Sequence, residues 1–332
     1  MRRTRGGPAA ALAVAVALAA LTGCGAGGGP ARPDPGPAPG PRSAAAAPEP
    51  DAGASRLLAR AEQVLISRCM AERGFAYAVT EPPAREHRSF PYGVDDVEWA
   101  RANGYGGRAA REDERARQAD PNQRWFHRLS ARERAAARTA LMGASPVGLS
   151  AEAPTGMTLT ASTEGCLAQA QRALYGDLAA WFRVKVVTMN LRPAQEERVR
   201  RDPRYAEAVG RWAACMRASG RPYESPEASR RAAAALAEEL PAERADAAET
   251  ALAVTEATCA TGTPLSRVSR TLDHTYGDEV RALHQDEIDL RRRLQNDALP
   301  RAERVVSPSE SDRSTDSTDS TDSTTRSGGS HG

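Results

Sequence analysis

Aromatic residues and net charge are both scarce in this sequence, and each scarcity excludes a class of protein. Aromatic side chains make up 5% of the 332 residues, and the hydrophobic fraction is 40%. Sheet cores favour β-branched and aromatic side chains, so this composition disfavours a sheet protein. The mean hydropathy of −0.55 excludes a polytopic membrane protein.

The charges of the two signs nearly cancel. The chain has 45 Lys and Arg residues against 43 Asp and Glu residues, which gives a formal net charge of +2. This balance excludes a strongly basic protein that binds nucleic acid, and it excludes an acidic, solvated chain. Lys185 is the only lysine among the basic residues. Together with the excess of alanine this is typical of a GC-rich genome, so the arginine content alone does not indicate a function.

Catalytic and cofactor motifs are also missing. The sequence contains no Gly-x-Ser-x-Gly elbow, His-Glu-x-x-His pair, Walker loop, Gly-x-Gly-x-x-Gly turn or EF-hand loop. Its best local cluster pairs His274 with Asp278, four residues apart on one face of a predicted helix. Arg281 follows on the same helix, and this favours an exposed ionic face over a metal or acid–base site. We therefore expect no metal, no cofactor and no catalytic residues.

Residues 1–23 have the pattern of a secretory signal peptide. Arginines at positions 2, 3 and 5 precede an uncharged apolar run from residue 9 to residue 21. A helix of this length spans about 20 Å, which is too short for a bilayer core of about 30 Å. A basic start followed by a short apolar run is typical of a signal for secretion.

The apolar run ends in Leu21-Thr22-Gly23-Cys24, which resembles the lipobox of bacterial lipoproteins. The resemblance implies that Cys24 carries a lipid on its sulfur, with acyl chains such as palmitate, and becomes the first residue of the mature chain. It also implies attachment to the extracytoplasmic face of the cell membrane. The alternative is an ordinary signal peptide followed by a cysteine that has no role in lipidation.

Both ends of the chain have compositions that do not form a packed core. Residues 24–53 are rich in Pro, Gly and Ala, with eight prolines between Pro30 and Pro50, and are expected to form a tether. Residues 300–332 are expected to form a disordered tail, in which the triplet Ser-Thr-Asp occurs three times. O-glycosylation of this tail is an alternative that the composition leaves open.

The sequence between the tails predicts an all-α fold. Apolar residues recur at helical spacing, for example at Leu58 and Ala61, and Gly74 follows as a helix-ending glycine. Continuous long helices are expected over 166–190 and over 264–296. Valines near residue 185 are compatible with a short strand, but the flanking pattern favours a helix there.

The body contains two segments with the same order of landmarks. The pattern Cys-Met-x-x-x-Gly-x-x-Tyr begins at Cys69 and again at Cys215. Each copy is followed by an Ala-rich segment, a second cysteine and a Tyr-Gly-Asp triplet. We therefore predict two internally duplicated helical-bundle units, over 54–200 and over 201–299.

Four cysteines remain when Cys24 is set aside, and they allow three disulfide pairings. The order of landmarks favours one bond within each unit, Cys69–Cys166 and Cys215–Cys259. An extracytoplasmic location permits disulfides, and Ala-rich helices bury little area, so a covalent clamp would supplement a thin core. A zinc site built from the four thiols is the alternative, but no Cys-x-x-Cys spacing supports it.

The first unit contains two insertions relative to the second, over 78–128 and 143–165. The most basic stretch of the body, residues 101–138, overlaps the first insertion and includes Trp125 and Phe126. One hypothesis is contact with an anionic partner such as a cell-wall polymer or lipid headgroups. The other is a solvated segment with internal charge pairs. The arginines assigned to an anionic contact are Arg101, Arg108, Arg111, Arg115, Arg124 and Arg128.

The body resembles secreted or lipid-anchored proteins of high-GC Gram-positive bacteria that carry Cys-Met…Gly…Tyr units. The resemblance covers residues 55–300 and implies no functional residues beyond the lipid-bearing and paired cysteines. The predicted function is a non-enzymatic binding or interaction module of the cell envelope, anchored to the membrane by its lipid. Its predicted partner is an envelope protein or an anionic wall polymer. A solute-binding lipoprotein of a transporter and an envelope hydrolase are the alternatives.

Overall fold

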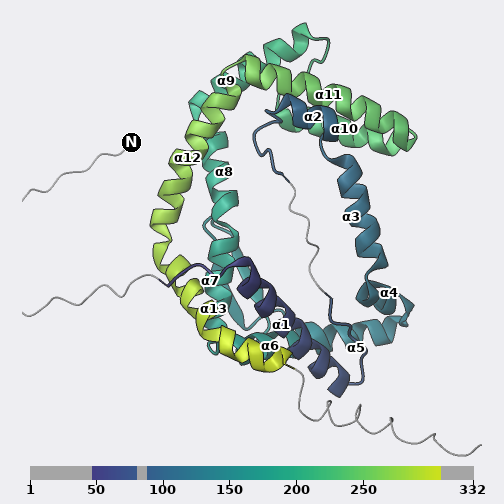
Figure 1. Ribbon diagram of the computed structural model, residues 1–332, viewed down its shortest axis with the longest axis vertical. Helices are drawn as coiled ribbons and strands as arrows, with labels where there is room; N and C mark the ends of the chain where they lie inside the picture. The colour runs from purple at the N-terminus through teal and green to yellow at the C-terminus, as the bar shows by residue number, and fades with distance from the viewer. Residues whose placement is uncertain (1–46, 81–87, 308–332) are drawn as a thin grey trace, which may run out of the picture. The chain divides into compact units, whose positions relative to one another are not determined.

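The computed structural model describes residues 47–80 and 88–307 (Figure 1). Cys24, the predicted signal peptide and most of both predicted tails lie outside the described residues. Within them the fold is helical, which confirms the all-α prediction. Two disulfides and one short β-hairpin complete the architecture of this part of the chain.

Thirteen helices follow one another along the described residues. The first five are α1 (Ala52–Glu72), α2 (Val97–Asn103), α3 (Gly107–Ala119), α4 (Pro121–Arg128) and α5 (Ala131–Met142). The next four are α6 (Gly165–Tyr175), α7 (Leu178–Met189), α8 (Leu191–Arg201) and α9 (Pro203–Ala218). The last four are α10 (Pro226–Glu239), α11 (Ala242–Gly262), α12 (Leu265–Leu283) and α13 (Gln285–Val306).

Polar caps and prolines set the points at which several helices begin. Asp51 Oδ1 accepts a hydrogen bond of 2.7 Å from the backbone N–H of Ala54 at the start of α1. Ser130 and Glu133 form a capping box at the start of α5. Helices α9 and α10 each begin with a proline at the first helical position, behind a capping side chain. These boundaries follow from short-range signals in the sequence.

Two predicted long helices are each broken in two. The helix expected over 166–190 is interrupted between α6 and α7 by Gly176, which has a φ of 77°. The helix expected over 264–296 is interrupted at His284, whose φ of −120° and ψ of 25° leave helical geometry. The apolar periodicity continues across both breaks, and for this reason the sequence pattern did not reveal them.

A β-hairpin between α5 and α6 is the one sheet among the described residues. Strand β1 (Leu149–Glu152) pairs antiparallel with β2 (Thr158–Ala161), and Ala151 lies opposite Leu159. The hairpin falls within the predicted insertion over 143–165. Its apolar residues pack against Phe182 and Val186 of α7, so it covers an apolar face of that helix. Strands of four residues carry too short an alternation to be read from the sequence.

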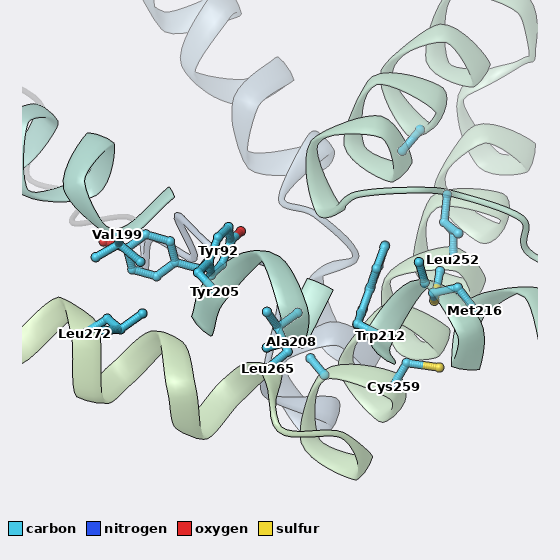
Figure 2. Packing of buried hydrophobic residues seen from close by; sticks show 13 residues of the cluster. Tyr92, Val199, Tyr205, Ala208, Trp212, Met216, Leu252, Cys259, Leu265 and Leu272 are labelled. Carbon is cyan, nitrogen blue, oxygen red and sulfur yellow. The ribbon is translucent and has the colours of Figure 1, made fainter. Parts of the chain in front are cut away.

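The most populated apolar cluster is built around Trp212 of α9 (Figure 2). Trp212 and Met216 are completely buried, and they pack with Leu252 of α11 and with residues of α12. Tyr92, from the segment before α2, meets Tyr205 of α9 edge-on, with 5.9 Å between ring centroids. The cluster therefore joins five consecutive helices, α8 to α12, and also holds the segment that leads into α2.

Helix α13 extends further than the sequence predicted. The disordered tail was expected from residue 300, but the helix continues to Val306 with Pro300 inside it. Ala298 and Ala302 are completely buried in a cluster that includes Leu58 of α1. This packing of small residues outweighs the polar composition and the proline. The predicted start of the tail at residue 300 is therefore wrong.

Helices from the two predicted units share apolar clusters. Besides the contact of α13 with α1, the α2 segment packs on α11 through Val94, Ala100 and Ala257. Residues just before α1 also contact α13, because the side chain of Asn296 donates to the backbone oxygen of Pro48 at 2.9 Å. No described helix combines the length and the apolar character needed to cross a membrane.

The two Cys-Met motifs end their helices in the same way. Helix α1 is followed by Gly74 with a φ of 80°, and α9 is followed by Gly220 with a φ of 71°. The backbone N–H of Phe75 donates to the oxygen of Met70, and that of residue 221 donates to the oxygen of residue 216, both at 2.9 Å. This is the Schellman pattern, which requires a left-handed residue where glycine stands. The two motifs are therefore locally equivalent.

Each motif carries a disulfide. Cys69 of α1 is bonded to Cys166 of α6, and Cys215 of α9 is bonded to Cys259 of α11, with Cα–Cα distances of 5.6 and 5.7 Å. These are the pairs that the order of landmarks predicted. The surroundings differ, however. The first bond reaches a separate helix beyond the hairpin, whereas α11 spans both the Ala-rich segment and its cysteine. Duplication of a whole unit is not confirmed.

Candidate ligand pocket beside the first helix end

A pocket of about 840 Å³ lies between α1, α3, α4 and α5. Pockets that hold small organic ligands have volumes of roughly 300–1,000 Å³, are mostly apolar and contain a few polar groups. This pocket fits that description. It is lined by Gln63, Met70, Tyr77, Thr80, Asp113, Ala116, Arg117, Asp120, Asn122, Gln123, Trp125, Phe126, Ala137, Arg138 and Leu141.

The buried part of the lining comes from α1, which the first disulfide joins to α6, and from α5. Met70 follows Cys69 on α1, and Ala137 belongs to α5; both are buried. The hydroxyl of Tyr77 donates to Gln63 Oε1 at 3.2 Å. Burial raises the pKa of Tyr77, so its hydroxyl remains a donor at neutral pH. The clamped helix end thus contributes both apolar surface and an oriented phenol.

Helix α4 is fixed against the chain that leaves α1. Asp120 Oδ1 caps α4 by accepting from the backbone N–H of Asn122 at 2.8 Å. The Asn122 side chain in turn accepts from Ala78 N at 2.8 Å and donates to Ala78 O at 2.9 Å. Trp125 meets Phe75 edge-on, with 6.3 Å between centroids. These contacts across more than forty residues hold the aromatic wall of the pocket in place.

A buried glutamate on α11 anchors the turn that leads into α3. Glu249 Oε1 accepts from the backbone N–H groups of Tyr105 at 2.7 Å and of Gly107 at 2.9 Å. Gly104 has a φ of 63°, and a Cβ on Gly107 would collide with the carboxylate. From this turn α3 runs to the pocket, where it contributes Ala116. The glycines of the turn are therefore required by the close approach of Glu249.

A second buried glutamate holds the same segment. Glu256 is completely buried; it accepts from Val94 N at 2.8 Å and from the hydroxyl of Tyr105 at 2.5 Å, and it also contacts Ser229 Oγ. Desolvation raises the pKa of Glu256, although all three donors oppose this. The sequence analysis missed both glutamates, because an acidic residue in an Ala-rich helix gives no signal until its partners are known.

The six arginines predicted to contact an anionic partner do not line the pocket. Arg101 pairs with Glu98, and Arg111 pairs with Asp246 of α11. The pocket uses Arg117 and Arg138 instead, which the sequence analysis did not select. The contact with a wall polymer stays a prediction. The other four arginines of the predicted set are exposed: Arg108, Arg115, Arg124 and Arg128.

A second, more polar pocket of about 380 Å³ lies near Tyr92 and α12. Its charged groups pair with one another: Arg192 lies 3.0 Å from Asp273, and Arg270 lies 2.8 Å from Asp95. The hydroxyl of Tyr92 also donates to Asp273, at 2.6 Å. Because these charges already have partners, this pocket offers a ligand less than the larger one does.

The histidine–carboxylate cluster of the last helices lies on the surface. His274 Nδ1 is 3.3 Å from Asp278 Oδ2, the histidine side chain is 82% exposed, and Arg281 approaches the same carboxylate at 2.6 Å. This is the exposed ionic face that the sequence favoured. Within residues 47–80 and 88–307, no three His, Cys, Asp or Glu side chains are placed to hold a metal ion.

Fold and pocket together define a class: an all-α protein clamped by two disulfides, with a pocket suited in size and lining to a small organic ligand. Comparisons with protein families, with curated proteins and with solved structures give no match for this chain.

Proposed function

We propose that this protein is a lipid-anchored, non-enzymatic binding protein on the extracytoplasmic face of a bacterial cell membrane. The observation that carries the binding role is the 840 Å³ pocket, which combines buried apolar side chains, an aromatic wall and a few polar groups. Contacts distant in sequence support the walls formed by α4 and α3, through the Asn122–Ala78 and Glu249–Tyr105 hydrogen bonds respectively. A preformed site of this kind favours ligand binding because little ordering is needed.

The proposed location is supported by features at the start of the chain and in its core. Leu21-Thr22-Gly23-Cys24 has the lipobox form, and residues 24–53 would separate the lipid from α1. Disulfides form and persist in oxidising compartments outside the cytoplasm. The four cysteines other than Cys24 are all used in the two disulfides, which leaves Cys24 as the single cysteine for a lipid.

Metabolic labelling tests the anchor. In a bacterial host grown with an alkyne-bearing palmitate, the wild-type chain should be labelled and should fractionate with membranes. Cys24→Ser should lose the label, whereas the paired variant Cys69→Ala/Cys166→Ala should keep it. Label that survives in Cys24→Ser would contradict the proposed lipidation.

Binding of a neutral fluorophore tests the pocket. N-phenyl-1-naphthylamine becomes fluorescent in apolar surroundings, and we expect saturable binding to the purified protein. Ala116 lines the pocket from α3 and is exposed, so Ala116→Trp should fill the pocket and abolish the signal without disturbing the core. Ala110→Trp is the matched control, because Ala110 is exposed on the same helix outside the pocket. An equal signal from both variants would refute the binding role of the pocket.

A further inference from the structure

The charged residues around the large pocket differ in whether they already have partners. Arg117 pairs with Glu114 at 2.7 Å. Asp120 is engaged in capping α4, and Asp113 also has an interaction partner. Arg138 has no carboxylate partner among the described residues. Of the four charged side chains among the described residues that line the pocket, it is the one for which the described part of the chain offers no ion-pair or capping partner.

Arg138 is also placed where a bound ligand would meet it. Its guanidinium carbon lies 5.8 Å from the centroid of the Phe126 ring. Phe126 and Trp125 are adjacent on α4 and both line the pocket. A flat or extended apolar group that packs on this wall would bring a substituent within reach of the guanidinium. Arginine presents several N–H donors in a plane that matches carboxylate, sulfonate and phosphate groups.

A cationic ligand is the opposing possibility, since aromatic side chains and two aspartates also line the pocket. The aspartates are less available than Arg138. Asp120 Oδ1 already accepts from two backbone N–H groups at the start of α4, those of Asn122 and Gln123. The face of Phe126 is already approached by the guanidinium of Arg138. A second cation there would be repelled by Arg138.

We infer that the pocket binds an anionic amphiphile, a small molecule with an apolar body and one acidic group that pairs with Arg138. This inference rests on the proposed binding function and names the ligand class. The apolar body packs against Met70, Trp125 and Phe126, and the acidic group lies at the exposed end of the pocket. Binding there is non-covalent.

Two fluorophores with the same skeleton isolate the charge. 8-Anilino-1-naphthalenesulfonate differs from N-phenyl-1-naphthylamine by its sulfonate group. We expect the sulfonate to bind about fivefold more tightly, the gain of a favourable exposed ion pair. Arg138→Gln should remove this preference, so that the variant binds the two probes with about equal affinity. Arg132→Gln is the matched control, because Arg132 is exposed on the same helix and does not line the pocket.

Competition extends the test to aliphatic ligands. Decanoate should displace the bound sulfonate at lower concentration than decanol, and decyltrimethylammonium should be the weakest competitor. If the neutral and anionic probes bind equally well, or if Arg138→Gln leaves the preference intact, the inference is wrong while the binding role survives. If neither probe binds, or if both bind Ala116→Trp as well as wild type, the binding role and the inference fail together.

Discussion

The helix ends at Cys69 and Cys215 share one local structure and have different surroundings. Both have the Schellman pattern, and both carry a disulfide. Three residues before Cys215 stands Trp212, which is completely buried and fills the core around the second bond. Three residues before Cys69 stands Ile66, and beside that helix end lies the large pocket.

The difference shows that the local motif determines how the helix ends and the chain turns. It does not determine which side chains pack around that helix end. Around Cys215 a single long helix, α11, supplies both Leu252 and Cys259 to the core. Around Cys69 the corresponding segment of the chain is divided among α5, the hairpin and α6, and α4 supplies one wall of the pocket. A pocket therefore lies beside one copy of the motif, whereas the buried Trp212 fills the core beside the other.

Removal of either disulfide should lower the free energy of unfolding by at least as much as any other change proposed below. By loop-closure entropy, loss of a bond that spans 97 residues costs about 4.7 kcal/mol of unfolding free energy, and loss of one that spans 44 costs about 4.0 kcal/mol. The variants are Cys69→Ala/Cys166→Ala and Cys215→Ala/Cys259→Ala, measured by urea unfolding. A markedly larger cost for the second pair would show that packing around Trp212 outweighs loop length.

The next largest effects should come from truncation of a core side chain in each region, and the loss of unfolding free energy should differ between the two. Trp212→Ala is expected to lower the free energy of unfolding by about 4 kcal/mol, because a large buried side chain leaves a cavity. Ile66→Ala, at the matching position, should cost about 3 kcal/mol. Equal losses in urea unfolding, with Trp212→Phe no better tolerated than Trp212→Ala, would contradict the filled-core account of the second region.

Among residues 47–80 and 88–307, Glu256 in the second region is the carboxylate that is completely buried and whose pKa is raised by desolvation, so this region should be the source of a pH effect. Because the folded pKa of Glu256 lies above the unfolded value, the folded state holds a proton that the unfolded state has released. Stability should fall as pH rises above about 4.3, by at most about 1.4 kcal/mol per unit. Glu256→Gln should remove this slope.

The measurement is the urea midpoint between pH 5 and pH 8 for wild type and variant. Glu239→Gln, at an exposed position on α10, controls for the loss of one charge. A difference between wild type and Glu256→Gln that stays constant with pH would show that the buried carboxylate does not titrate in this range.

The smallest effects should come from the two helix-ending glycines, and they should be equal. Gly74 and Gly220 have positive φ, and a Cβ on either would meet no atom within 4 Å. Alanine at either position should therefore cost only the backbone strain, about 1 kcal/mol. Gly210→Ala, inside α9, should instead stabilise by up to about 1 kcal/mol. Unequal costs at Gly74 and Gly220 would break the local equivalence of the motifs.

Much of the architecture was predictable because its signals are short-range. The helical class, the caps at Ser130 and Ser225 and the glycines that end α1 and α9 depend on neighbouring residues. The disulfide pairing was predictable because the landmarks occur in the same order twice. The breaks at Gly176 and His284, the hairpin and the last turns of α13 were not, because tertiary packing decided them.

The pocket was only partly visible in the sequence. Trp125 and Phe126 are conspicuous as adjacent large apolar residues on an otherwise polar short helix. Arg138 gave no such signal, because it is one arginine among many. Only its position over the Phe126 ring in the folded chain distinguishes it from the others. The arginines selected by density alone lie outside the pocket lining.

The sequence by itself determined the helical composition, the boundaries set by caps and glycines, and the cysteine pairs. It is also the basis of the proposed lipid anchor at Cys24. The tertiary structure alone decided that one Cys-Met helix end is filled and the other borders a pocket. The physical reason is the range of the interactions. Caps and helix ends are satisfied within a few residues, whereas the pocket depends on contacts such as Glu249 with Tyr105, 144 residues apart.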